Sequence, residues 1–257
     1  MNSGRPSENR DMGAIQHVCL DKDGTLTDVH TYWADIITKR ADRVLTAFSL
    51  PPGYLSPLVE AMGVDSASGR ILPAGPVGYK PRSVVIAAAV DQLERWDIDA
   101  AEDGLASIFR DVDQELLSSR TYHVEVLPGT HEALRTLKGA GLKLSIYTSD
   151  RLDALKEILR AHDLERYFDA EVGGDEVRNP KPDPEGFRTA CHRVGVDVRE
   201  SAYVGDTADD MRMAASGGSA GGLGVACGLC SAADLLRFTT LVFDDLLEVA
   251  AFVAAKK

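Results

Sequence analysis

Short apolar segments alternate with amphipathic segments over the second half of the chain. The apolar runs predict strands, and the segments with apolar residues at helical spacing predict helices. The expected strands are 142–147, 170–172, 201–204, 223–225 and 240–243, and the expected helices are 131–140, 152–161, 184–194, 210–215 and 245–254. Such alternation is typical of a parallel sheet covered by helices on both faces.

The first half of the chain has a different pattern. Residues 14–20 are mostly apolar and predict one strand of the same kind. After it, apolar positions recur at helical spacing over 32–50, 83–96 and 100–117, without a strand pattern between them. Residues 69–81 are rich in Gly and Pro and predict a loop between two of these helices.

Together the patterns predict an α/β fold with a Rossmann-like parallel sheet core, helices on both faces and an inserted α-helical domain. The core would comprise residues 13–28 and 124–257, and the insertion would comprise residues 29–123. Residues 1–12 are polar and predict a disordered tail. A chain of 257 residues is long enough for two such domains.

Charge and hydropathy narrow the class of partner. The net charge of −12 disfavours nucleic acid and anionic membrane surfaces, because both attract clustered Lys and Arg. No apolar run approaches the ~20 residues that cross a bilayer. Residues 1–12 lack the apolar centre of a signal peptide, so we expect a cytoplasmic protein. A small anionic substrate is compatible with this charge, because a metal ion and local cations can reverse the field within a pocket. These patterns do not indicate an oligomeric state.

The four cysteines are too few for a disulfide scaffold and fit a reducing cytoplasm. Cys227 and Cys230 form a single CxxC pair, whereas a structural zinc site normally takes a second pair of ligands. Two interpretations of this pair stay open, namely incidental loop thiols and a redox or metal role.

Two carboxylates stand at the end of the first expected strand. Asp21 and Asp23 follow residues 14–20 directly, and Gly24 comes next. Burying two neighbouring carboxylates is costly unless a cation or a reaction requires them. The alternative interpretation is a Gly-containing turn that only ends the strand.

Other polar side chains stand at comparable positions further along the chain. Thr148 follows one expected strand, Lys181 precedes an expected helix, and Asp206 and Asp210 follow another strand. Loops after parallel strands share one edge of the sheet, so these groups can converge. Asp206 and Asp210 would share a helix face if a helix starts near residue 206. Carboxylates suit Mg²⁺, and a hydroxyl and an ammonium group suit a phosphoryl group. Taken singly, Thr148 could also cap a helix, and Lys181 and Asp210 could be solvated surface residues.

In their order along the chain, these residues resemble the motifs of the haloacid dehalogenase superfamily of phosphohydrolases. Asp-Lys-Asp-Gly-Thr-Leu-Thr-Asp at 21–28 is similar to the first motif, and Thr148 to the second. Lys181 before Pro182 is similar to the third motif, and Gly-Asp-Thr-Ala-Asp-Asp at 205–210 to the fourth. The helical insertion resembles the C1-type cap domain of the phosphoglycolate-phosphatase-like subfamily.

The resemblance implies a role for each residue of the motifs. Asp21 would be the nucleophile that forms an aspartyl-phosphate, and Asp23 would protonate the leaving oxygen and then activate water. The residues implied to bind the phosphate are Thr148, Ser149 and Lys181, and those implied to bind Mg²⁺ are Asp21, Asp23, Asp206 and Asp210. Ser149 stands where many relatives carry Asn.

The inserted domain is expected to select the substrate. Tyr79, Lys80 and Arg82 lie around the Gly- and Pro-rich loop, which resembles the specificity loop of such caps. The two basic residues could meet an anionic substrate. The alternative is a solvated linker between two helices.

The resemblance implies a Mg²⁺-dependent phosphatase that hydrolyses a small phosphorylated metabolite, a phosphate monoester. One alternative is a phosphotransferase or phosphomutase that passes the phosphoryl group to a sugar hydroxyl. Another is a catalytically inactive regulator that binds a phosphorylated ligand. A dehalogenase or a phosphonate hydrolase is disfavoured, because such relatives lack the second carboxylate, which is present here as Asp23.

Overall fold

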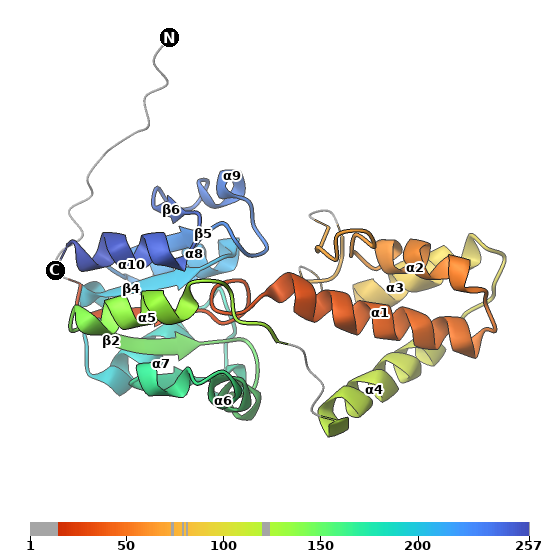
Figure 1. Ribbon diagram of the computed structural model, residues 1–257, viewed down its shortest axis with the longest axis horizontal. Helices are drawn as coiled ribbons and strands as arrows, with labels where there is room; N and C mark the ends of the chain where they lie inside the picture. Colours follow the sequence, from red (N-terminus) through yellow and green to blue (C-terminus); the bar gives the residue numbers. More distant parts are fainter. Residues whose placement is uncertain (1–14, 73–74, 79, 81, 120–123, 257) are drawn as a thin grey trace, which may run out of the picture. The chain divides into compact units, whose positions relative to one another are not determined.

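The computed structural model of the protein describes residues 15–72, 75–78, 80, 82–119 and 124–256 (Figure 1). The tail predicted over residues 1–12 lies outside this part of the chain. The chain divides into two compact units, one formed by Met1–Leu26 with Leu127–Lys257 and the other by Thr27–Val126. Each unit is described by itself.

The first unit is built on a six-stranded sheet in which all paired strands run parallel, in the order β3-β2-β1-β4-β5-β6. The strands are β1 (His17–Leu20), β2 (Lys143–Tyr147), β3 (Ala170–Val172), β4 (Ser201–Gly205), β5 (Gly221–Val225) and β6 (Val242–Phe243). This confirms the α/β fold with a parallel Rossmann-like sheet. Each strand predicted from the pattern is present, with bounds that differ by up to three residues.

Strand β1 lies in the middle of the sheet and is fully buried, as its mostly apolar residues predict, although it begins with His17. Its last residue, Leu20, is paired with Ile146 of β2 on one side and with Val204 of β4 on the other. The three strands therefore end at one edge of the sheet. This strand order places a topological switch point at that edge, where ligands bind in open α/β sheets.

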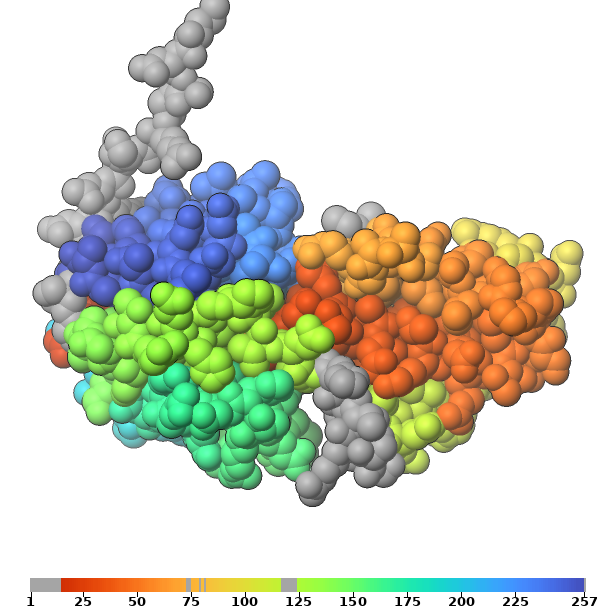
Figure 2. All heavy atoms as spheres, in the orientation of Figure 1, coloured from red at the N-terminus to blue at the C-terminus, as the bar shows by residue number. Residues whose placement is uncertain are grey.

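Helices cover the sheet on both faces, and the described residues contain four short 3₁₀ helices, three of them in this unit. The helices are α5 (Thr130–Gly139), α6 (Leu152–Ala161), α7 (Glu185–Val194), α8 (Ala208–Gly217), α9 (Ala232–Leu235) and α10 (Leu246–Ala254). The 3₁₀ helices of this unit are Glu165–Tyr167, Gly174–Glu176 and Val198–Glu200, and the fourth is Pro52–Tyr54. Helices α5 and α10 lie side by side at the surface (Figures 1 and 2). Helices α7 and α8 bury Phe187 and Met213 against Tyr147 and Tyr203 of the sheet.

The second unit is helical, as its apolar spacing predicts. Its helices are α1 (Val29–Ala47), α2 (Leu55–Ala61), α3 (Arg82–Glu94) and α4 (Glu102–Ser119). Helix α1 starts at the N-cap Asp28, whose carboxylate accepts hydrogen bonds from the His30 and Thr31 amides. Helix α2 is absent from the sequence prediction, because it is short and carries Pro57 in its first turn. The assignment of this unit as a cap domain stays a prediction.

None of the helices in the described residues is long and apolar enough to cross a membrane.

A buried histidine links the three central strands of the core. His17 is 0% exposed, and its ring lies 2.7 Å from Ser145 Oγ through Nε2 and 2.9 Å from Ser201 Oγ through Nδ1. The Ser201 hydroxyl donates to the carbonyl of Asp197, so its oxygen accepts from Nδ1–H of the ring. Nε2 then accepts from Ser145, and the neutral ring is satisfied at both nitrogens. Burial lowers the pKa of His17 from 6.5 to about 4, an effect that Asp169 opposes.

We expect His17 to make the fold sensitive to mild acid. Between pH 6.5 and about 4 the unfolded chain binds a proton at His17 that the folded chain does not bind. The free energy of unfolding therefore falls as the pH falls through this window, by ~3 kcal/mol at most from this group. Denaturant unfolding at several pH values should show that His17→Asn loses this share of the pH dependence.

His192→Asn, on the exposed surface of α7, is the control and should keep this share of the pH dependence. Equal pH dependence in wild type and His17→Asn would contradict the prediction.

Candidate active site

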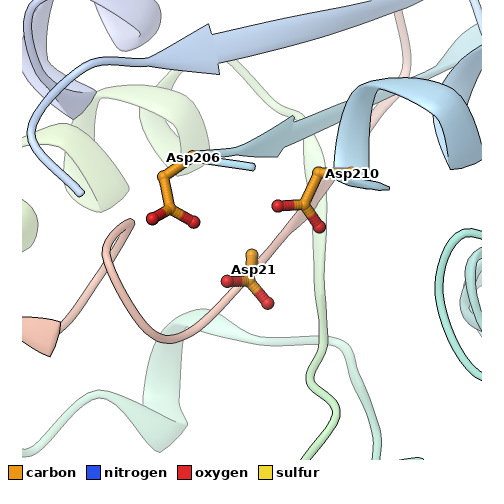
Figure 3. A group of neighbouring side chains, drawn as sticks. All are labelled: Asp21, Asp206 and Asp210. Atoms are coloured by element: carbon orange, nitrogen blue, oxygen red, sulfur yellow. The ribbon is translucent and has the colours of Figure 1, made fainter. Parts of the chain in front are cut away.

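Three carboxylates from two distant parts of the chain converge at the edge of the sheet where β1 and β4 end. Asp21 follows β1, Asp206 follows β4, and Asp210 lies in the first turn of α8, with their side chains directed toward a common space (Figure 3). One oxygen of each lies within 4.8 Å of an oxygen of both others, and all three residues are buried. The sequence analysis expected that these groups can converge, because loops after parallel strands share one edge of the sheet.

Local hydrogen bonds hold Asp21 and Asp210 in place. The amide of Asp21 donates to the Val204 carbonyl over 2.9 Å, which ties the end of β1 to β4. Thr207 is the N-cap of α8, and its amide and hydroxyl donate to Asp210 Oδ2 over 3.1 and 2.5 Å. Since α8 begins at Ala208, the expectation that Asp206 and Asp210 share a helix face is wrong. They meet because Asp206 ends the strand and Asp210 closes the capping box.

Two glycines make room for Asp206. A Cβ atom at Gly24 or Gly228 would lie 2.1 or 2.0 Å from Asp206 Oδ2, so neither position tolerates a side chain without displacing the carboxylate. The Leu229 amide donates to the same oxygen over 2.7 Å. Oδ1 of Asp206 is buried and has no hydrogen-bond partner among the described residues.

The loop that carries Gly228 is the CxxC segment, and sequence reasoning missed its part in the site. Neither Cys227 nor Cys230 forms a disulfide in the described part of the chain, and Cys227 Sγ donates to the Gly24 carbonyl oxygen over 3.4 Å. The contribution of this segment to Asp206 comes from its backbone, at Gly228 and Leu229. A glycine between two cysteines after an apolar strand was the available signal, but it does not by itself identify a contact with Asp206.

Lys181 is the cation among these carboxylates. Its Nζ lies 2.5 Å from Asp21 Oδ1 and 2.9 Å from Asp210 Oδ1. It also lies 5.2 Å from the ring centre of Tyr147 and 5.4 Å from that of Tyr203, within the range of cation–π attraction. The two tyrosines occupy strand positions that the pattern assigns to the core, so sequence reasoning gave them no contact with the site.

Burial dominates the electrostatics of the site. It raises the pKa of Asp21 above the usual carboxyl range, with Lys181 opposing and Asp210 adding to the rise. It raises the pKa of Asp206 strongly, and the charges of Asp21 and Asp210 raise it further. For Lys181, burial opposes the charged form, but Asp21 and Asp210 outweigh it and raise the pKa, so the lysine is protonated.

This donor set fits a divalent cation. Three carboxylates face one lysine, which leaves excess negative charge, and Asp206 Oδ1 is a buried oxygen without a partner in the described part of the chain. A bound cation would lower the pKa of Asp21 and Asp206 and so keep both carboxylates ionised. Carboxylate oxygens with room for water and phosphate are the environment that Mg²⁺ prefers.

Asp23, the second carboxylate of the first motif, has a different environment. Its side chain is 28% exposed, and its Oδ1 accepts a hydrogen bond from Lys22 Nζ over 2.5 Å. Lys22 also lies 2.8 Å from Asp150 Oδ2. Sequence reasoning assigned neither Lys22 nor Asp150 a function.

Thr148 and Ser149 follow β2 at the same edge. Thr148 is 2% exposed, its amide donates to the Val172 carbonyl, and its Oγ accepts from the Asp150 amide over 3.1 Å. It does not cap the next helix, since Arg151 is the N-cap of α6. Ser149 is exposed, beside the strand end. Their phosphate-binding roles stay predictions.

The residues expected to choose the substrate belong to the second unit. Tyr79 lies outside the described residues, and Lys80 is exposed. Arg82 is exposed and forms an ion pair with Asp113, whose other oxygen accepts from Arg40 over 2.7 Å. Since Arg82 already faces a carboxylate, binding an anionic substrate would require this pair to open or to be shared.

Comparisons with known proteins place these features in a family. The model of the haloacid dehalogenase-like hydrolase family matches residues 15–218. The chain is 42% identical over 104 residues to Probable phosphatase IndB of Dickeya dadantii (strain 3937). This matched segment covers 40% of this chain and 45% of that protein. It is 28% identical over 209 residues to the phosphoglycolate phosphatase of Escherichia coli (strain K12), covering 79% of each.

Solved structures show the same fold. A predicted phosphoglycolate phosphatase from Haemophilus somnus 129PT superposes with a TM-score of 0.69 at 21% identity, covering 94% of this chain and 99% of that chain. A hydrolase of the haloacid dehalogenase superfamily, subfamily IA, from Geobacter sulfurreducens PCA superposes with a TM-score of 0.66 at 19% identity, covering 94% and 97%. The family match spans the insertion and the core as far as α8, and we conclude that the chain belongs to the haloacid dehalogenase-like hydrolase family.

Proposed function

We propose that this chain is a Mg²⁺-dependent phosphatase that hydrolyses a small phosphate monoester through an aspartyl-phosphate intermediate. The observation that carries the proposal is the convergence of Asp21 with Lys181, Asp206 and Asp210 in one buried site. Membership of the hydrolase family supports it, as do relatives that are named as phosphatases. Those names make a phosphoric monoester the expected class of substrate.

The proposed metal ligands are the carboxylates of Asp21, Asp206 and Asp210, together with the backbone carbonyl of Asp23. The buried and unpartnered Oδ1 of Asp206 supports this assignment. When bound, Mg²⁺ would offset the negative charge of the carboxylates and of the phosphate group and would polarise the phosphoryl oxygens.

In the first proposed step, an oxygen of Asp21 attacks the phosphorus atom in line with the leaving oxygen. A bond forms between Asp21 and phosphorus, and the bond from phosphorus to the alcohol oxygen breaks. Asp23 gives its proton to that oxygen, so the alcohol leaves in neutral form. The partial exposure of Asp23 supports this role, because a proton carrier must reach both solvent and substrate.

In the second step, a water molecule attacks the phosphorus atom of the aspartyl-phosphate. The carboxylate of Asp23 takes a proton from the water as the new bond to phosphorus forms. The bond between phosphorus and Asp21 breaks, which releases inorganic phosphate and restores Asp21. Asp23 is then protonated again, ready for the next substrate.

Lys181, Thr148 and Ser149 are proposed to bind the phosphoryl oxygens. The protonated ammonium group of Lys181 touches the nucleophile itself, so it can follow the charge that shifts onto the phosphoryl group in the transition state. Thr148 offers a hydroxyl at the end of β2, next to the strand that leads to Asp21.

The second unit is proposed to act as the cap that selects a small phosphorylated metabolite. Tyr79, Lys80 and Arg82 stay candidates for contact with that substrate. The net charge of −12 supports a metabolite rather than nucleic acid or a membrane as the partner, and it is compatible with the proposed cytoplasmic location.

One experiment can distinguish the phosphatase from the two alternatives, a phosphotransferase and an inactive regulator. Purified protein with Mg²⁺ is incubated with p-nitrophenyl phosphate, with and without glucose, and the released phosphate and any glucose phosphate are measured. Release of inorganic phosphate as the main product supports the phosphatase. Preferential transfer to the sugar would establish a phosphotransferase, and tight ligand binding without turnover would establish a regulator.

We expect Asp21→Asn to abolish turnover of p-nitrophenyl phosphate, by at least about 10³-fold, because the amide cannot form the aspartyl-phosphate. Thermal unfolding should show that the variant still folds. The matched control is Asp153→Asn, an exposed carboxylate at the start of α6, which should keep wild-type turnover. Undiminished turnover by Asp21→Asn would exclude Asp21 as the nucleophile.

We expect Asp206→Asn to stabilise the metal-free protein by ~1–2 kcal/mol, because it removes one of three crowded and buried carboxylates. Wild type should gain ~3 kcal/mol when Mg²⁺ is present at a hundred times its dissociation constant, whereas Asp206→Asn should gain much less. Thermal unfolding in EDTA and in Mg²⁺ measures both effects without any substrate. The exposed Asp209→Asn serves as control and should respond to Mg²⁺ as wild type does. A wild-type protein that Mg²⁺ does not stabilise would contradict the metal site.

A further inference from the structure

Lys22 is a buried cation of the first motif to which the proposed mechanism gives no role. It is 1% exposed and is among the largest fully buried side chains of the described chain. Its Nζ lies 2.5 Å from Asp23 Oδ1 and 2.8 Å from Asp150 Oδ2. A buried ammonium group is costly unless its geometry is well matched to its partners, so this bridge is a specific feature of the site.

We propose that Lys22 is a positioning residue that fixes the carboxyl group of Asp23 by bridging it to Asp150. The inference rests on the proposed function, in which Asp23 carries the proton to the leaving oxygen. Lys22 itself would touch neither the phosphate nor the reacting atoms.

The bridge from Lys22 joins Asp150, whose backbone is held in place, to Asp23 in the site. The amide of Asp150 donates to Thr148 Oγ over 3.1 Å, and its carbonyl accepts from the Gly174 amide over 2.7 Å, so the backbone of Asp150 is held on two sides. The side chains of Asp23 and Asp150 are 28% and 43% exposed, and Asp23 lies on a loop closed by the hydrogen bond from the Leu26 amide to the Lys22 carbonyl.

The same contacts connect the proposed phosphate-binding residue Thr148 with the proposed proton carrier Asp23. Thr148, proposed to bind the phosphate, contacts Asp150, Asp150 contacts Lys22, and Lys22 contacts Asp23. A proton carrier must lie within hydrogen-bond reach of the leaving oxygen, and an error of one ångström in its position is costly in rate. The bridge therefore sets the position of the proton carrier relative to the phosphate site.

The charge of Lys22 is secure in this environment. Burial would lower its pKa, but the carboxylates of Asp23 and Asp150 outweigh burial and raise the pKa above the ordinary value. The ammonium group thus stays charged at neutral pH and can donate hydrogen bonds to the carboxyl groups of Asp23 and Asp150.

The test compares two substrates of similar size whose leaving groups differ in their need for a proton. The p-nitrophenolate ion leaves p-nitrophenyl phosphate without protonation, whereas the alkoxide of benzyl phosphate must be protonated. We expect Lys22→Met to lower kcat/KM for benzyl phosphate by about tenfold or more, and that for p-nitrophenyl phosphate by less than about threefold. The ratio kcat/KM covers the steps up to departure of the alcohol, so hydrolysis of the aspartyl-phosphate does not enter.

Three further variants separate positioning from a general effect on the fold. Lys143→Met removes an exposed lysine that pairs with Asp169 at the other end of β2, and it should leave both substrates unaffected. Asp150→Asn should lower kcat/KM for benzyl phosphate by a smaller factor than Lys22→Met, because Lys22 keeps its contact with Asp23. The double variant Lys22→Met/Asp150→Asn should lose no more than Lys22→Met alone, since Asp150 acts through Lys22.

The outcomes are distinct. A loss confined mainly to benzyl phosphate supports the positioning role. An equal loss on both substrates, no loss, or a gain on benzyl phosphate overturns it, while the proposed phosphatase function stands. A wild-type protein that hydrolyses neither substrate overturns the proposed function, and the positioning role with it. If Lys22→Met does not fold, Asp150→Asn decides by the same ratio between substrates.

Discussion

The active edge of the core depends on one interaction, the contact of the Lys181 ammonium group with Asp21 and Asp210. Without Lys181, three carboxylates would be buried within 4.8 Å of one another, and the cation that contacts two of them would be lost. One lysine does not balance three carboxylates, and Asp206 keeps an oxygen without a partner in the described structure. The remaining negative charge is unfavourable in the metal-free protein, and the proposed Mg²⁺ would offset it.

The fold supplies what this charge distribution requires. Because β1 lies between β2 and β4 and all three run parallel, Asp21, Thr148 and Asp206 leave the sheet at one edge. The close approach of Asp206 depends on the absence of a side chain at Gly24 and at Gly228, which come from loops about two hundred residues apart in the chain. The site is thus as much a property of backbone packing as of the carboxylates.

Local pattern predicted the sheet, most helices and the residues at strand ends, because period and turn chemistry are properties of short segments. What it could not predict depends on partners distant in sequence. The ion pair between Arg82 and Asp113 joins two helices of the inserted unit, and the contact of Lys181 with the Tyr147 ring joins a loop to a strand. The shared helix face of Asp206 and Asp210 failed for a local reason, since Thr207 caps the helix one residue later than Asp206.

The first motif places two carboxylates two residues apart, and the structure gives each of them its own lysine. Asp21 is paired with Lys181, which also holds Asp210, whereas Asp23 is paired with Lys22, which also holds Asp150. The two bridges share no member among these contacts, although the charge of Asp23 still contributes to the raised pKa of Asp21. The bridge at Asp21 lies in the buried cluster with excess negative charge, while the bridge at Asp23 reaches a carboxylate that is partly open to solvent. In the proposed mechanism, this arrangement separates Asp21, which must stay ionised, from Asp23, which must exchange a proton.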